Sequence, residues 1–221
     1  MRAFIGIMLC CFFLTNCKAQ DSDFKSYLGN FGNTNLPLLI RDRQSYHSVF
    51  NQRYDSIFHE TYQEIPEGLV TKYICTKGFC NPDAGYFSYS YGVKIDYGQD
   101  FLIVLVNKFR YEGDTEWDFD LGEILLITYN SKGEILSRQS LTKDNDRWKS
   151  NLKITKEGIT VLQIKITEPK IDQYHRDLRC EYWTTTYQIT TNGIIKPFDT
   201  SPVSTGIVIW DKINEEYVLK E

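Results

Sequence analysis

Residues 87–95 read Phe-Ser-Tyr-Ser-Tyr-Gly-Val-Lys-Ile. Large apolar side chains stand at every second position, with small or polar residues between them. Successive side chains of a β-strand point to opposite faces of the sheet, so this period of two predicts a strand with one buried face. The apolar run that follows, Phe101–Val106, has no such alternation and is expected of a central strand.

Three strand–turn–strand units follow these two segments. Each has a short polar turn that ends in glycine, which adopts the left-handed backbone conformation of tight turns at little cost. The predicted units are Ile124–Tyr129 with Glu134–Leu141, Trp148–Thr155 with Ile159–Thr167, and Tyr182–Thr190 with Ile194–Lys196.

Strands that follow one another without intervening helices exclude a parallel α/β sheet. The prediction is a mainly β fold in which an antiparallel meander forms a curled sheet, a barrel or a sandwich. Residues 23–80 differ from the rest. Phe24, Tyr27, Leu28 and Phe31 have the spacing of one helix face, and the segment 45–62 has a similar pattern. We therefore expect short N-terminal helices that pack on the sheet.

The chain has 221 residues, 42% of them hydrophobic and 24% charged, which suits a packed protein and argues against disorder. We expect a single β-rich domain over residues 23–221, with its helical N-terminal part at 23–80. The net charge of -4 leaves no basic surplus to meet phosphates, so nucleic acid is excluded as a partner.

The N-terminus has the pattern of an export signal. Arg2 precedes an apolar run, Ala3–Leu14, which is too short to span a bilayer but has the length of a signal-peptide core. Leu14-Thr15-Asn16-Cys17 is similar to a lipobox, although Asn16 stands where a smaller residue is usual. This interpretation gives a signal peptide at 1–16, lipidation of Cys17 and a tether at 17–22. The alternative is ordinary cleavage after Ala19.

Either cleavage predicts a protein of the cell envelope, held at a membrane by its lipid if Cys17 is acylated and periplasmic or secreted otherwise. Cys75, Cys80 and Cys180 lie beyond the leader, in a compartment where disulfides form. Cys75 and Cys80 enclose a short loop with a glycine, so we expect a local bridge between them. The alternative joins Cys180 to one of the two.

The run 112–123 holds six acidic residues and no Lys or Arg. It is interpreted either as a solvated connection between strands or as a docking surface for a basic protein, with Trp117 and Phe119 as apolar anchors. Carboxylates at every second position also allow a weaker alternative, a calcium site. The partner-binding candidates are Asp114, Glu116, Trp117, Asp118, Phe119 and Asp120, and the calcium alternative uses Asp114, Glu116, Asp118 and Asp120.

Enzyme signatures are largely absent from the sequence. It contains no G-x-S-x-G, no H-E-x-x-H, no phosphate-binding glycine loop and no dinucleotide fingerprint. We therefore expect no cofactor and no resident metal, and the balance favours a protein that is not an enzyme. The high aromatic content, with 15 Tyr and 13 Phe, is interpreted as core and interface packing before sugar binding.

A resemblance adds to this picture. The leader 14–20, the segment 35–40 and the strand–turn–strand units 128–136 and 187–195 resemble those of small uncharacterised exported lipoproteins of the Bacteroidota. Some proteins of that kind are envelope immunity proteins, which neutralise toxins from neighbouring cells. The resemblance therefore implies a non-enzymatic, protein-binding lipoprotein. The alternatives are a glycan-binding module, a glycoside-acting enzyme and a structural envelope protein.

Overall fold

The computed structural model describes residues 22–50, 53–55, 59–61, 63–75, 87–98, 100–111, 119–143, 147–168, 177–212 and 216–220. Its first helix covers residues 22–29. The next elements are β1 (Gly32–Thr34), β2 (Leu38–Ile40), α2 (Arg43–Phe50), β3 (Arg53–Asp55), β4 (His59–Thr61) and α3 (Glu67–Tyr73). The long strands are β5 (Phe87–Ile95), β6 (Leu102–Tyr111), β7 (Phe119–Tyr129), β8 (Ile135–Ser140), β9 (Trp148–Ile154), β10 (Ile159–Ile166), β11 (Leu178–Ile189), β12 (Ile195–Thr200), β13 (Ser204–Asp211) and β14 (Glu216–Leu219).

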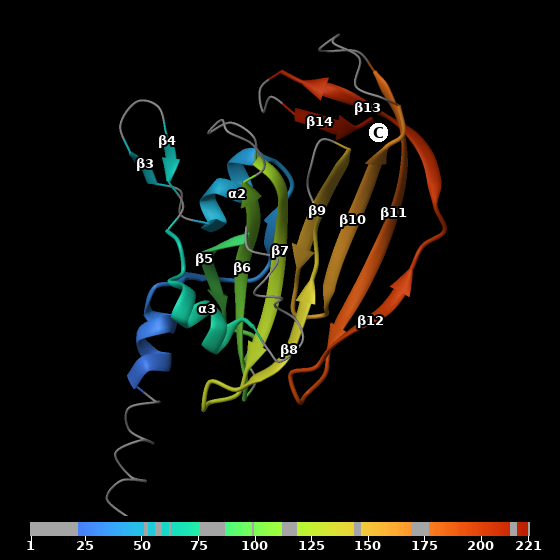
Figure 1. Ribbon diagram of the computed structural model, residues 1–221. Coiled ribbons are helices and arrows are strands. Elements are labelled where there is room, and N and C mark those ends of the chain that lie inside the picture. The colour runs from blue at the N-terminus through green and yellow to red at the C-terminus, as the bar shows by residue number, and fades with distance from the viewer. Residues whose placement is uncertain are drawn as a thin grey trace, which may run out of the picture.

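The fold is mainly β and is built from two sheets (Figure 1). Sheet A has the strand order β1-β5-β6-β7-β8. Sheet B has the order β14-β13-β11-β10-β9-β2, with β12 paired to β11, and it is a strongly curled antiparallel half-barrel. A separate short hairpin joins β3 to β4.

The predicted meander is confirmed, since β5, β6, β7 and β8 pair with their sequence neighbours in antiparallel register. The predicted turns are confirmed at Gly133 and Gly193, whose backbone φ values of 81° and 76° lie in the left-handed region. The parallel pairing of β1 with β5, which places Gly32 opposite Val93, was not expected.

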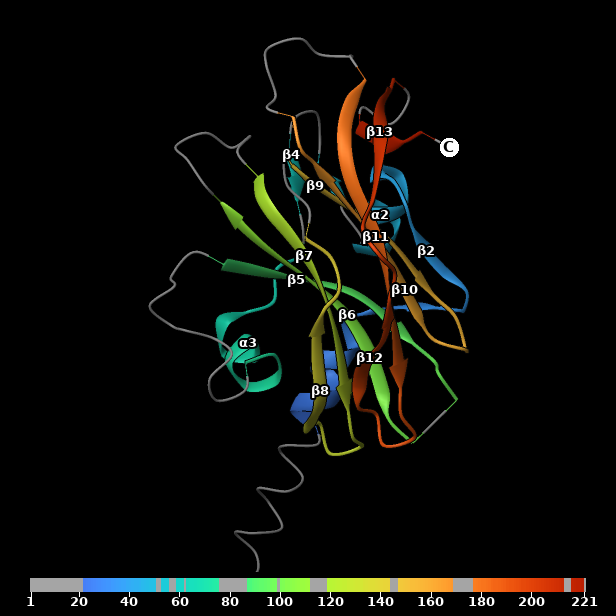
Figure 2. The same cartoon turned by 90° about the vertical axis from the view of Figure 1, so that its right-hand side faces the viewer.

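The main core lies between the two sheets (Figure 2). Leu105 and Leu126 from sheet A meet Leu152 and Val161 from sheet B, and all four are essentially inaccessible to solvent. The helix α2 contributes Val49 and Phe50 to this same core. Because apolar burial is the dominant stabilising term in folding, this contact fixes the two sheets and α2 relative to one another.

A second core lies on the opposite face of sheet A, where the helix 22–29 and α3 pack. Its centre is a group of aromatic rings that includes Tyr27, Tyr73 and Tyr129. The Tyr129 hydroxyl donates to the backbone oxygen of Tyr73 and lies 3.2 Å from the Tyr27 hydroxyl. These bonds satisfy buried hydroxyl groups whose desolvation would otherwise be costly, so the helices are joined to the sheet by polar as well as apolar contacts.

The short N-terminal helices are confirmed, but the helix predicted over residues 45–62 is wrong for its later part. The helix 22–29 is confirmed, and within the segment 45–62 the described helix, α2, has Phe50 as its last residue. After Phe50, residues 53–55 pair with residues 59–61 as strands, and β1 and β2 join the two sheets. Strand pairing therefore overrides an apolar spacing that is compatible with either structure.

Candidate functional site

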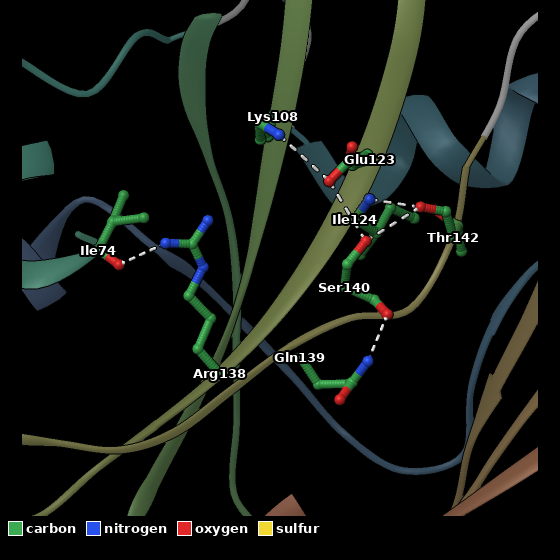
Figure 3. Close-up of polar contacts among 8 residues, drawn as sticks. All are labelled: Ile74, Lys108, Glu123, Ile124, Arg138, Gln139, Ser140 and Thr142. Carbon is green, nitrogen blue, oxygen red and sulfur yellow. Dashed lines mark hydrogen bonds and ion pairs between the residues drawn. The ribbon is translucent and has the colours of Figure 1, made fainter. Parts of the chain in front are cut away.

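The outer face of sheet A is covered by helices over only part of its area. The remaining area, near the start of β5 and the end of β6, carries a polar cluster (Figure 3). Along each strand, successive side chains point to opposite faces of the sheet. The helices cover Tyr89, Leu125 and Ile127 on the outer face. The residues of the cluster lie either directly opposite these three or two positions away from them along the same strand, so their side chains are on the outer face too. We call it the polar face of sheet A, and it consists of Phe87, Lys108, Glu123, Arg138 and Ser140.

An ion pair lies at the centre of the polar face. Lys108 on β6 is directly opposite Glu123 on β7, and the ammonium nitrogen lies 3.3 Å from a carboxylate oxygen. The two side chains are only 16% and 24% exposed. The same ammonium lies 4.0 Å from the centroid of the Phe87 ring, within cation–π range. A pair shielded in this way is screened less by salt than one at an open surface.

Residues at the end of β8 and just beyond it form hydrogen bonds with β7. The Ser140 hydroxyl donates to the same Glu123 carboxylate oxygen at 3.3 Å. Two residues further on, the buried Thr142 hydroxyl accepts a hydrogen bond of 3.0 Å from the backbone nitrogen of Ile124 (Figure 3). Glu123 therefore has two side-chain partners from two neighbouring strands, which restrict its orientation.

Arg138 connects the polar face to the helix layer. Its guanidinium donates to the backbone oxygen of Ile74, just beyond the end of α3, at 2.9 Å. The guanidinium also lies near Tyr89. Burial raises the pKa of the Tyr89 hydroxyl, and the positive charge of Arg138 opposes that rise. Arg138 thus holds a positive charge between sheet A and the end of α3, on the same face of the sheet as the Lys108–Glu123 pair.

The arrangement is suited to binding. It combines an exposed aromatic ring with charges that are held on rigid strands by several partners each. Among the residues that the structure describes, no group of three or more His, Cys, Asp or Glu side chains is arranged to hold a metal ion.

The structure describes little of the predicted acidic docking segment. Phe119 and Asp120 are the first residues of β7, opposite Tyr111 and Arg110. The interpretation of the whole run 112–123 as a connecting loop is therefore wrong for its last five residues, which belong to a strand. Four candidates lie outside the described residues, so their partner-binding and calcium roles stay predictions: Asp114, Glu116, Trp117 and Asp118.

The alternative bridge through Cys180 is wrong. Cys180 is a free thiol, 2% exposed, and burial raises its pKa. It lies in a small apolar cluster of sheet B, whereas Cys75 packs with the helices on the outer face of sheet A. No disulfide joins these two described cysteines. Cys75 is not a free thiol, but Cys80 and Cys17 lie outside the described residues, so the local bridge and the lipidation stay predictions.

The sequence interpretation missed Lys108, Arg138 and Ser140, and it treated Glu123 only as one of six acidic residues. A signal was present for two of them. Lys108 interrupts the apolar strand that begins at Leu102, and Glu123 directly precedes the apolar run of the next strand. Two charged residues on adjacent strands are expected to face each other when they lie equally far from the turn that joins the strands. The strand register that shows this for Lys108 and Glu123 comes only from the structure.

Within the described residues, no helix is both long and apolar enough to cross a membrane. Comparison with known proteins gives no assignment, because no family model, curated protein or solved structure matches the chain.

Proposed function

We propose that the chain is an exported cell-envelope lipoprotein that binds another protein and has no enzymatic activity of its own, with the polar face of sheet A as its contact surface. The observation that carries this proposal is the position of Phe87. Phe87 is 36% exposed and its ring lies against the Lys108 ammonium, at the point where the helices no longer cover the sheet. Aromatic residues are enriched in protein–protein interfaces, where polar residues form the rim around them.

The energetics of the ion pair support the same proposal. Lys108 and Glu123 are already partly shielded from water, so a partner that covers them removes little additional hydration. The strands that carry them, β6 and β7, are joined by the acidic run proposed above as a docking segment. Charge of this kind steers a basic partner toward the surface and fixes its orientation more than it adds affinity. The most concrete form of the proposal is an immunity protein whose partner is a basic toxin.

Variants of the exposed apolar residues test this surface. The Phe87→Ala variant is expected to weaken partner binding about tenfold or more, because it removes the aromatic anchor. Leu102→Ala is the matched control, since Leu102 is 38% exposed but lies at the opposite end of β6. Binding is measured by calorimetry with the partner purified from envelope extracts. Equal affinities for the two variants would show that the polar face is not the contact surface.

Lipidation is proposed at Cys17. We expect the N-terminal peptide of the native protein to begin at this cysteine and to carry the added mass of its acyl chains. The Cys17→Ser variant is expected to be absent from the membrane fraction, because it cannot be acylated and so has no lipid to hold it at the membrane. Intact-mass and peptide measurements check both points. An unmodified N-terminus at Gln20 would contradict the anchor and support a soluble exported form.

A further inference from the structure

A second surface lies on sheet B and is independent of the polar face. Two rows of side chains cross the neighbouring strands β9, β10 and β11 on the face that also bears the inter-sheet core residues Leu152 and Val161. The first row is Ser150, Gln163 and Trp183, and the second is Trp148, Lys165 and Glu181. All six are partly exposed, whereas the next row toward the core is Leu152, Val161 and Thr185, which is buried.

The two tryptophans meet across the strand that separates them. Trp148 is on β9 and Trp183 is on β11, yet their ring centroids are 5.6 Å apart and the ring planes are perpendicular. Because perpendicular rings present one flat face beside one edge, the pair forms a rigid aromatic corner on the sheet.

Two lysine side chains lie close to this aromatic corner. The ammonium groups of Lys143 and Lys165 each lie 5.8 Å from the Trp148 ring centroid. Lys165 also lies 3.5 Å from Glu181, and both of these side chains are more than 40% exposed. Alternation along β11 places the 84% exposed Arg179 on the same face as Trp183. Arg179 is itself paired with Glu168 at 3.5 Å. Among the described residues, three positive groups, Lys143, Lys165 and Arg179, therefore stand with two carboxylates on this surface, although the whole chain has a net charge of -4.

We propose that this surface binds a carbohydrate that carries carboxylate groups. Sugar rings have apolar C–H faces that pack on an indole, and their hydroxyl groups pair with amide, hydroxyl and carboxylate side chains such as Gln163 and Glu181. The lysine ammonium groups supply the positive charge that a uronate requires.

A glycan fits this surface better than a protein partner does. Among the described residues, the large hydrophobic side chains with high exposure are Leu39, Phe87, Leu102, Phe198, Val203 and Ile207. None of them belongs to the two rows, and Ile207, opposite Arg179 on β13, is the one that borders this surface. A protein contact typically adds apolar side chains around its aromatic anchors, whereas the surroundings of Trp148 and Trp183 are polar and charged.

Polygalacturonate and its fully methyl-esterified counterpart test the proposal, because they share one sugar backbone and differ in charge. We expect the purified protein to bind polygalacturonate, with quenching or a shift of tryptophan fluorescence, and to bind the ester at least tenfold more weakly. The Trp183→Ala variant is expected to lose at least tenfold in affinity. The double variant Lys143→Gln and Lys165→Gln is expected to bind more weakly and with a smaller dependence on salt.

Two controls make the outcome specific. Trp210→Phe changes a tryptophan on β13 that pairs with Tyr217, and Phe87→Ala changes the polar face of sheet A. Both are expected to bind polygalacturonate as the unchanged protein does. Circular dichroism and thermal unfolding establish that each variant is folded. The proposal is overturned if the folded protein binds neither polymer, if it binds both equally, or if folded Trp183→Ala retains full affinity.

Discussion

Gly193→Ala is expected to lower the free energy of unfolding by about 2–4 kcal/mol, since backbone strain and overpacking act together. Gly193 closes the turn between β11 and β12 with a φ of 76°, where an L side chain is strained. A Cβ atom there would lie 2.7 Å from Leu136 Cδ1 and 3.1 Å from Phe101 Cγ. The backbone oxygen of Gly193 also accepts a 2.6 Å hydrogen bond from the Thr128 hydroxyl. The turn therefore has little room to shift.

Gly98→Ala separates the two contributions. Gly98 has a similar φ of 69°, but no atom lies within 4 Å of an added Cβ. This variant is expected to lose only the backbone contribution, about 1–2 kcal/mol. Urea unfolding of both variants at neutral pH gives the difference directly. Equal losses at the two positions would mean that the turn of sheet B does not pack on sheet A as described.

Phe50→Ala is expected to cost about 3–5 kcal/mol, the range of large aromatic truncations in a core. Phe50 is 0% exposed and is the last residue of α2. Its ring packs 4.7 Å from that of Tyr46 and lies so close to Gly92 that a Cβ there would be 2.7 Å from it. Phe50 belongs to the core that residues of both sheets form. The cavity left by its missing ring would therefore lie where α2 packs against the two sheets.

Phe198→Ala is the matched control for this second prediction. Phe198 is the same residue type at 67% exposure on β12, so its truncation is expected to change stability by less than about 0.5 kcal/mol. Chemical denaturation followed by tryptophan fluorescence measures both variants. A loss below about 1 kcal/mol for Phe50→Ala would contradict the position of α2 in the inter-sheet core.

The strands were predictable because their signals are local. The alternation in residues 87–95 and the glycine turns at Gly133 and Gly193 depend only on side-chain direction and backbone conformation. The mainly β fold class follows from these signals. The helix at 22–29 was predictable for a similar reason, because four aromatic or aliphatic residues lie at helical spacing.

Pairings between distant segments were not predictable from these patterns. The three residues of β1 show no strand pattern of their own, and they form a strand because β5 offers a parallel edge. The end of α2 at Phe50 is likewise set by its tertiary surroundings, since the apolar spacing continues beyond it. The polar face of sheet A depends on register in the same way, because Lys108 and Glu123 are 15 residues apart.

Photo-cross-linking at one position tests the proposed function most directly. Among the residues that the structure describes, two phenylalanines are exposed and lie on different sheets, Phe87 on sheet A and Phe198 on sheet B. Each is replaced in turn by a benzoyl-phenylalanine, and the protein is irradiated in the cells that produce it. The proposal predicts a discrete protein adduct from position 87 and none from position 198. An adduct only at position 198, or no protein adduct at position 87, would contradict binding at the polar face of sheet A.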